Sequence, residues 1–95
     1  MKLVKNFEWN EEKNIKLIAE RGIGFEEVIV AIQHGHLLGV VKGKEPNYAH
    51  QRIFVVSVDG YTYAVPFIEE SHKIYLKTIY PSRVLHKQFS GGLVK

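Results

Sequence analysis

The residues of this chain best suited to chemistry are cations that gather toward its C-terminal end. From residue 73 onward the sequence has no acidic side chain, but it has the lysines and arginines Lys73, Lys77, Arg83, Lys87 and Lys95. The acidic side chains gather in the first third, at Glu8, Glu11, Glu12, Glu20, Glu26 and Glu27. One end of the molecule can therefore present a cationic surface to a polyanion such as RNA.

Two small groups of residues, one in this C-terminal part and one in the middle of the chain, have the residue types that phosphate chemistry needs. Arg83 stands near the start of a possible helix, itself an anion site, with His86 and Lys87 about one turn further on. His50 and Arg52 stand two residues apart, which puts both on one face of a strand. An arginine fork matches phosphate oxygens, and a histidine can exchange protons near neutral pH. The alternatives are a solvated basic helix end and a loop histidine beside a strand-edge arginine.

Other chemistries find little support. The chain has no cysteine, which rules out disulfides, thiolate zinc sites and a cysteine nucleophile. His34 and His36 have no third ligand nearby, so we interpret them as a surface pair rather than a metal site. Residues 39–44 lack the spacing and the hydroxyl of a phosphate loop. We therefore expect neither a metal nor a cofactor.

Length and composition indicate a single globular domain. Ninety-five residues leave no room for a second core, and the 45% hydrophobic content argues against disorder. No apolar run is long enough to span a membrane, and Asn6 and Glu8 interrupt the opening too soon for a signal peptide. We expect a cytoplasmic protein with no membrane partner, whose residues 90–95 form a frayed tail.

Two short helices should follow an opening strand at residues 3–9. Asn10 is a good N-cap and Gly22 a C-terminal stop, which predicts a helix over residues 11–21. The apolar residues of this helix share one face: Ile15, Ile18 and Ala19. The spacing of the next apolar residues predicts a second helix from residue 25 to about residue 34.

The second half of the chain changes to the period of strands. Strands are expected at residues 37–41, 51–58, 61–68 and 72–80. The two-residue turn Asp59-Gly60 is a strong hairpin signal. Pro66 cannot donate to a sheet ladder, so its part of the strand should lie on an edge or at a bulge. Ser82 can cap a short C-terminal helix.

This order of elements predicts an α+β fold. Two N-terminal helices would pack on one face of a mainly antiparallel sheet, the opposite face would be partly free, and a short C-terminal helix would follow. Side chains in the last strand alternate between a basic, aromatic side and a side suited to the core. The first set is Lys73, Tyr75 and Lys77, and the second is Ile74, Leu76 and Thr78.

Three segments together resemble the BrnT family of toxin ribonucleases. Residues 7–14 (FEWNEEKN) are like the family's aromatic-x-Trp-Asp-x-x-Lys opening. Residues 21–28 (RGIGFEEV) are like its His-Gly-Ile-x-Phe-Glu-Glu helix junction. Residues 77–83 (KTIYPSR) are like its final strand, which leads into Ile-Ser-x-Arg and a basic helix. The resemblance extends over nearly the whole chain, from about Phe7 to Phe89.

The resemblance implies a RelE-like fold, metal-independent RNA cleavage and a cognate antitoxin. That antitoxin is expected to be a ribbon-helix-helix dimer that covers the basic face. The chain departs from the family's pattern at three positions and in its C-terminal helix, which is Arg-rich with a Glu in the family and reads RVLHKQF here, over residues 83–89. Asn10 stands where the family usually has Asp, Leu17 where it often has Asn, and Arg21 where it usually has His. These departures bear on catalysis more than on fold, because polar residues are the ones that differ.

In metal-independent cleavage a 2′-hydroxyl attacks the adjacent phosphorus, and a protein can supply a base, an acid and a cation. Resemblance and residue types together assign these catalytic roles to Arg83, Arg52, His50 and Lys87. RNA contacts are expected from Lys77, Tyr80, His86 and Lys73. Two alternatives stay open: a module of the same fold that binds RNA or antitoxin without cutting, and a domain with an unrelated protein partner.

Overall fold

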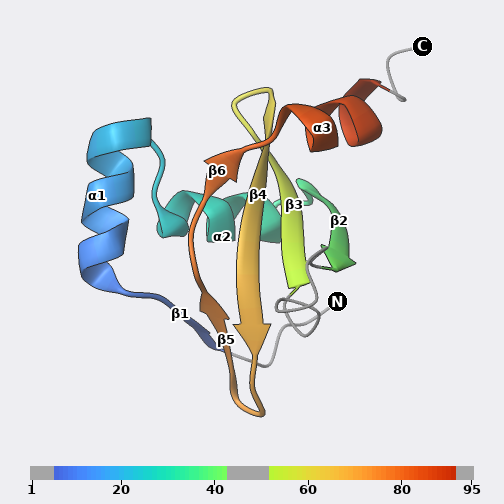
Figure 1. Cartoon of the computed structure of the whole chain (residues 1–95). Helices are drawn as coiled ribbons and strands as arrows, with labels where there is room; N and C mark the ends of the chain where they lie inside the picture. Colours follow the sequence, from blue (N-terminus) through green and yellow to red (C-terminus); the bar gives the residue numbers. More distant parts are fainter. Residues whose placement is uncertain (1–5, 43–51, 92–95) are drawn as a thin grey trace.

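The structure, a computed structural model, describes residues 6–42 and 52–91 (Figure 1). In chain order the elements are β1 (Asn6–Glu8), α1 (Glu11–Arg21), α2 (Phe25–Gln33), β2 (Leu37–Lys42), β3 (Arg52–Val58), β4 (Tyr61–Glu69), β5 (Lys73–Leu76), β6 (Tyr80–Pro81), α3 (Arg83–His86) and a π-helical segment, Lys87–Gly91, that continues α3. Within these ranges no helix is long and apolar enough to cross a membrane.

The strands form one mixed sheet. Its order is β1-β5-β4-β3-β2, and β6 pairs with β4 beyond the end of β5. β1 runs parallel to β5, and the other described pairs are antiparallel. The hairpin predicted at Asp59-Gly60 joins β3 to β4, and both turn residues have the positive φ angles, 52° and 81°, that a tight hairpin turn needs. The predicted α+β class is confirmed.

The expected last strand is divided in two, and Pro66 lies where the division falls. β5 pairs with β4 at residues 67–69, whereas β6 pairs with it at residues 63–64. Pro66 is therefore in an interior strand, at a local gap between β5 and β6 rather than at the predicted edge or bulge. Its carbonyl accepts a hydrogen bond from the Lys77 backbone N–H at 2.8 Å, on the side of the break. A backbone N–H at position 66 would point into the same gap between β5 and β6. The missing N–H of the proline therefore costs the sheet no hydrogen bond.

The first helix begins and ends at the residues that its caps predict. Asn10 Oδ1 accepts a hydrogen bond from the Lys13 backbone N–H at 2.9 Å. At the other end Gly22 adopts the left-handed conformation, with φ of 73°, and its N–H donates to the Ile18 carbonyl at 2.9 Å. These caps fix where the side chains at the start of α1 lie.

The buried side of α1 is not the one that its apolar spacing indicates. Asn14 and Leu17 are buried, whereas Ile15 is 60% and Ile18 is 51% exposed. Asn14 faces inward because its Oδ1 accepts a hydrogen bond at 2.7 Å from the backbone N–H of Phe25, the first residue of α2. The amide therefore joins the two helices and satisfies a donor that a helix start leaves unpaired.

Replacing Asn14 with leucine should lower the free energy of unfolding by about 2 kcal/mol, because the buried Phe25 N–H loses its acceptor. Urea denaturation measures this difference. As a control, Ile15→Ala changes an exposed side chain of the same helix and should shift stability by less than about 0.5 kcal/mol. Equal effects of the two substitutions would show that the Asn14 hydrogen bond does not stabilise the fold.

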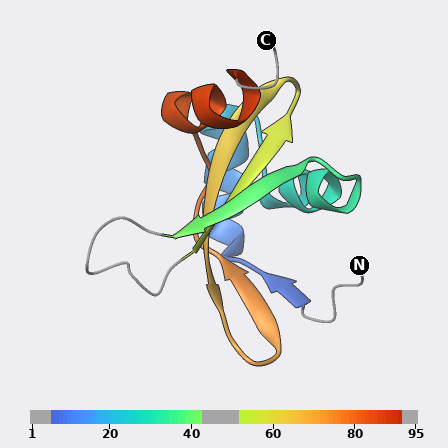
Figure 2. The ribbon, with the colours of Figure 1, turned by 90° about the vertical axis from the view of Figure 1, so that its right-hand side faces the viewer.

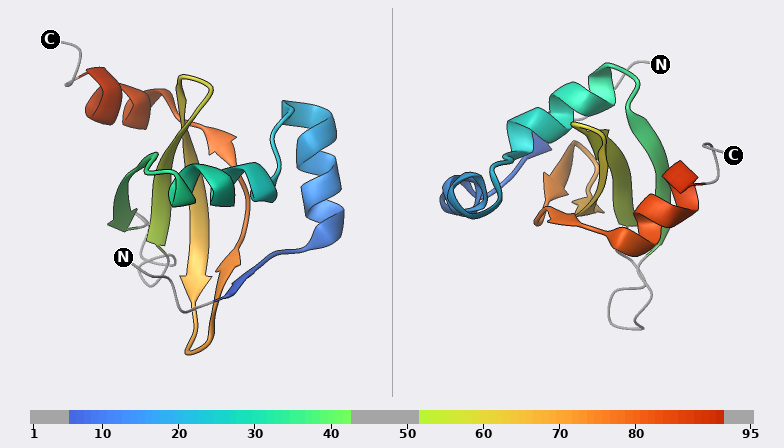
Figure 3. Two further views of the ribbon diagram at one scale, coloured as in Figure 1. Left: turned by 180° about the vertical axis from the view of Figure 1, so that it is seen from behind. Right: turned by 90° about the horizontal axis from the view of Figure 1, so that it is seen from above.

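The helices α2 and α3 lie on opposite faces of the sheet (Figures 2 and 3). The main core is on the α2 side and includes Phe25, Val28, Phe54, Val65 and Phe67. Val55 and Ala64 alternate with these strand residues and are fully buried on the other side. There the C-terminal segment packs closely: a Cβ added at Gly39 would come within 2.8 Å of the Phe89 ring. The face expected to be partly free is thus covered at one end by the third helix.

Candidate nucleic-acid interface

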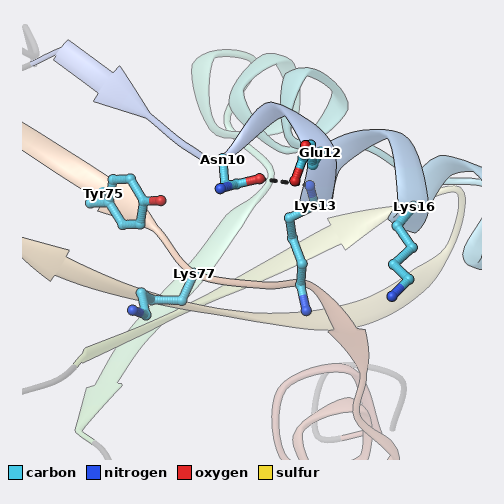
Figure 4. Close-up of a pocket in the computed structure, with 6 residues that line it drawn as sticks. All are labelled: Asn10, Glu12, Lys13, Lys16, Tyr75 and Lys77. Carbon is cyan, nitrogen blue, oxygen red and sulfur yellow. Dashed lines mark hydrogen bonds between the residues drawn. The ribbon is translucent and has the colours of Figure 1, made fainter.

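A basic hollow lies where the start of α1 meets β5 (Figure 4). It has a volume of about 390 Å³ and is lined by Asn10, Glu12, Lys13, Lys16, Tyr75 and Lys77. Three of these side chains are cationic and one is anionic, so the formal charge of the lining is +2. Such a hollow can hold an anion that bears more than one charge.

The parallel pairing of β1 with β5 builds this hollow. Glu8 lies opposite Tyr75 in that pairing, so the chain leaves β1 beside β5 and starts α1 there. Lys13 and Lys16 stand three residues apart and share one side of the helix, near Lys77. The sequence predicted Lys77 at an RNA surface but not the two helix lysines, because spacing within a helix does not reveal which strand lies beside it.

The polar groups at the opening are mostly hydrogen-bond donors. Asn10 uses its Oδ1 as the cap of α1, so its amide NH₂ group faces outward, toward Tyr75 in Figure 4. The Lys77 Nζ lies 5.6 Å from the centre of the Tyr75 ring, a cation–π distance. An anion in the hollow can therefore meet ammonium, amide and hydroxyl donors together.

Lys73 lies in β5 and Lys77 directly follows it, and the two lysines differ in their surroundings. The predicted alternation is confirmed for residues 73–76, where Ile74 and Leu76 are buried in the core, but it ends there, because Thr78 is only half-buried and Ile79 is fully buried. Lys73 Nζ lies 3.4 Å from Glu8 Oε1 and 3.9 Å from Glu70 Oε1, so carboxylates already offset its charge. Lys77 has no carboxylate partner among the residues that the structure describes. Of the two predicted RNA contacts, Lys77 is the better placed.

A second basic group occupies the start of α3. Ser82 Oγ accepts a hydrogen bond from the Leu85 backbone N–H at 3.2 Å, which confirms the predicted cap. Arg83 is the first residue of the helix and is exposed, as is Lys87 one turn later. Because residues three and four apart share one side of a helix, Arg83, His86 and Lys87 form a group.

His86 is held in place by two contacts. Its Nδ1 lies 2.9 Å from the hydroxyl of Thr62, a residue that is only 1% exposed. Its ring also stacks on Tyr61, with centroids 4.3 Å apart and planes inclined by 20°. These contacts anchor α3 to the sheet and fix the orientation of the imidazole. Nε2 is the ring nitrogen left to face a ligand.

The chain matches no protein-family model, no curated protein and no solved structure. In the described ranges, no three His, Asp or Glu side chains are grouped so that they could hold a metal ion.

The structure does not bring Arg52 to the Arg83 group. Arg52 Nη1 lies 3.7 Å from Glu69 Oε1, at the far end of the β3–β4 pair. The chain enters α3 near Thr62, and Arg52 stands five residues along β3 from the position opposite Thr62, which corresponds to about 16 Å. Because side chains alternate along β3, Arg52 also points to the face of the sheet opposite α3. His50 lies outside the described residues.

Tyr80 lies between the two basic groups. It belongs to β6, is 38% exposed, and lines a largely apolar groove of about 460 Å³ between α3 and the sheet. The chain from Lys77 to Arg83 spans at most about 20 Å. The hollow, Tyr80 and the start of α3 can thus contact one extended ligand. We call the surface formed by residues 77–83, which leads from the hollow to Arg83, the 77–83 strip.

Proposed function

We propose that the protein is an RNA-cleaving toxin of the kind that the BrnT resemblance implies, with a RelE-like fold. The observation that carries the proposal is the basic hollow, which gathers Lys13, Lys16 and Lys77 around one opening. Three ammonium groups suit a polyanionic backbone, because each phosphate contact releases counterions. The 77–83 strip offers a strand of RNA a path from the hollow to Arg83.

In this proposal the hollow positions the RNA and does not read its sequence. Lysines contact phosphate as point charges, and such contacts carry no base information. The exposed ring of Tyr80 supplies a stacking surface for an unpaired base along the way. The expected substrate is therefore single-stranded RNA, bound with an affinity that falls steeply as salt rises.

The group at the start of α3 supplies the chemistry. During cleavage the 2′-oxygen forms a bond to phosphorus while the bond from phosphorus to the 5′-oxygen breaks. Arg83 would grip the phosphoryl oxygens and offset the charge that they gain in the transition state. His86, oriented by Thr62 and Tyr61, would accept the 2′-hydroxyl proton or protonate the leaving 5′-oxygen through Nε2. Lys87 would add a second cation.

A binding module without catalysis is the second candidate. The separation of Arg52 from Arg83 favours it, because two of the residues expected to act together are apart. The same surface would then hold RNA, or an acidic partner protein, without cutting. RNA that is bound with a steep salt dependence but never shortened would identify this case.

The resemblance also leads us to propose a cognate antitoxin, a ribbon-helix-helix dimer, and a cytoplasmic site of action. To block the reaction, this partner would have to cover the hollow or the start of α3. Growth arrest on induction in a bacterial host, relieved by the product of the adjacent gene, would support this part of the proposal. Arrest with intact total and messenger RNA would count against it.

Lys77 and Lys73 form a matched pair for a binding test. Lys77→Ala should weaken binding of single-stranded RNA by about tenfold and lower the salt slope by about 0.7, because one phosphate contact is lost. Lys73→Ala removes the same charge four residues earlier in the chain, but from a lysine that Glu8 and Glu70 already pair, so the change should stay within about twofold. Fluorescence anisotropy over a salt series measures both. Equal losses would mean that only net charge matters.

A further inference from the structure

The charge of the basic hollow exceeds what one internal phosphate of RNA needs. Its lining has a formal charge of +2, and an internal phosphodiester has a single negative charge. A terminal phosphate is a monoester, which has a charge of about −1.5 to −2 near neutral pH and three strong acceptor oxygens. Charge balance therefore favours the end of a strand over its middle.

The net charge of the hollow depends on Asn10, whose side chain is uncharged. Its Oδ1 is taken by the Lys13 N–H, so the group it turns to the hollow is a donor. An aspartate, which the BrnT pattern usually has at this position, would cap the helix equally well. It would also place a second carboxylate in the lining and reduce its charge to +1. The charge of +2 in the lining thus depends on the uncharged side chain of Asn10.

Two further features favour a compact dianion. The hollow opens beside the N-terminal end of α1, where the partial positive charge of the helix dipole adds to that of the lysines, while Glu11 and Glu12 in the first turn offset part of it. The Lys77 ammonium lies over one face of the Tyr75 ring, 5.6 Å from the ring centre. A ligand in the hollow would therefore contact the Tyr75 hydroxyl rather than stack on that face. Ammonium, amide and hydroxyl donors suit the three oxygens of a monoester.

We propose that the hollow binds the terminal phosphate of an RNA strand. This inference rests on the proposed function for the choice of RNA, and it adds which part of the RNA the hollow takes. With one end held there, the strand runs along the 77–83 strip toward Arg83. Strands that end in a phosphate, as many products of RNA cleavage do, would then be preferred over strands with hydroxyl ends.

Three oligoribonucleotides of one sequence test the proposal with the full-length protein. One has a 5′-phosphate, one a 3′-phosphate and one hydroxyls at both ends, and all carry 2′-O-methyl groups so that the 2′-oxygen cannot attack. Anisotropy at fixed ionic strength should show that one phosphorylated strand binds at least about tenfold tighter than the hydroxyl strand. The position of the favoured phosphate tells which end is held.

The matched variant is Asn10→Asp, which keeps the cap and changes only the charge and donor at the hollow. It should retain the thermal unfolding midpoint of the wild type and reduce the preference to about twofold or less. Equal binding of the three strands by the wild type would overturn the inference while leaving RNA binding intact. A preference that survives both Asn10→Asp and Lys77→Ala would overturn it as well. Binding of none of the strands would overturn the proposed function itself.

Discussion

Removing all three ammonium groups of the hollow should weaken binding of single-stranded RNA by roughly a hundredfold and lower the salt slope by about 2. The variant is Lys13→Ala/Lys16→Ala/Lys77→Ala. Each lysine would otherwise neutralise a phosphate and release a counterion, so the slope counts the contacts that are lost. The three side chains lie at the surface around an open hollow, and their removal should leave the fold intact.

A control with the same net charge separates the site from general electrostatics. Arg21→Ala/Arg52→Ala/Lys73→Ala removes three positive charges that lie outside both the hollow and the groove lined by Tyr80. This control should lose no more than about fivefold in affinity, through the weaker overall field of the protein. If both triple variants lose affinity and slope to the same extent, the hollow is not the RNA contact. Isothermal titration or anisotropy at several salt concentrations gives both quantities.

Replacing Arg83 with alanine should reduce the rate of RNA cleavage by about a hundredfold to a thousandfold, the loss typical when a group that stabilises transition-state charge is removed. RNA affinity should fall by less than about tenfold, because the hollow remains. Single-turnover cleavage of a labelled RNA in the presence of EDTA measures the rate. Arg83 is exposed at the helix start, so its truncation should leave the fold intact, and the unfolding midpoint checks this.

Two companion variants sharpen the Arg83 test. Arg83→Lys keeps the charge but loses the planar fork, so it should recover only part of the rate. Arg21→Ala removes an exposed arginine from another helix and should cleave at the wild-type rate. Unchanged cleavage in Arg83→Ala would remove this guanidinium from the reaction and favour the binding-module alternative.

The local elements of the fold could be predicted because their signals are local. Asn10, Gly22 and Ser82 act as caps where the sequence places them, and the Asp59-Gly60 turn joins the expected strands. The order of strands could not be predicted, since parallel pairing of β1 with β5 depends on contacts between residues far apart in the chain. The division of the predicted last strand into β5 and β6 also depends on such long-range contacts.

The orientation of α1 shows how tertiary contacts override apolar spacing. A count of hydrophobic residues favours burying Ile15 and Ile18, yet Asn14 and Leu17 are inside. The buried Oδ1 of Asn14 accepts a hydrogen bond from the Phe25 N–H, so burial leaves neither of these two groups without a partner. Helix periodicity alone does not reveal such a polar contact between helices.

Sequence reasoning located one part of the candidate site and missed another. Lys77 was predicted, because the alternation of the last strand is a local pattern. Lys13 and Lys16 were missed, because only the sheet topology brings them to Lys77. Residue type and the family resemblance group Arg52 with Arg83, but the length of β3 keeps the two apart.

The most direct test is to incubate the purified wild-type protein with single-stranded RNA in EDTA and to follow the length and end groups of the RNA. We expect shortened products with a 5′-hydroxyl on one side of each cut and a 2′,3′-cyclic phosphate on the other, because the attacking group is the neighbouring 2′-oxygen. RNA that keeps its full length, with a binding affinity that the triple lysine variant does not change, would contradict both the reaction and the surface proposed for it.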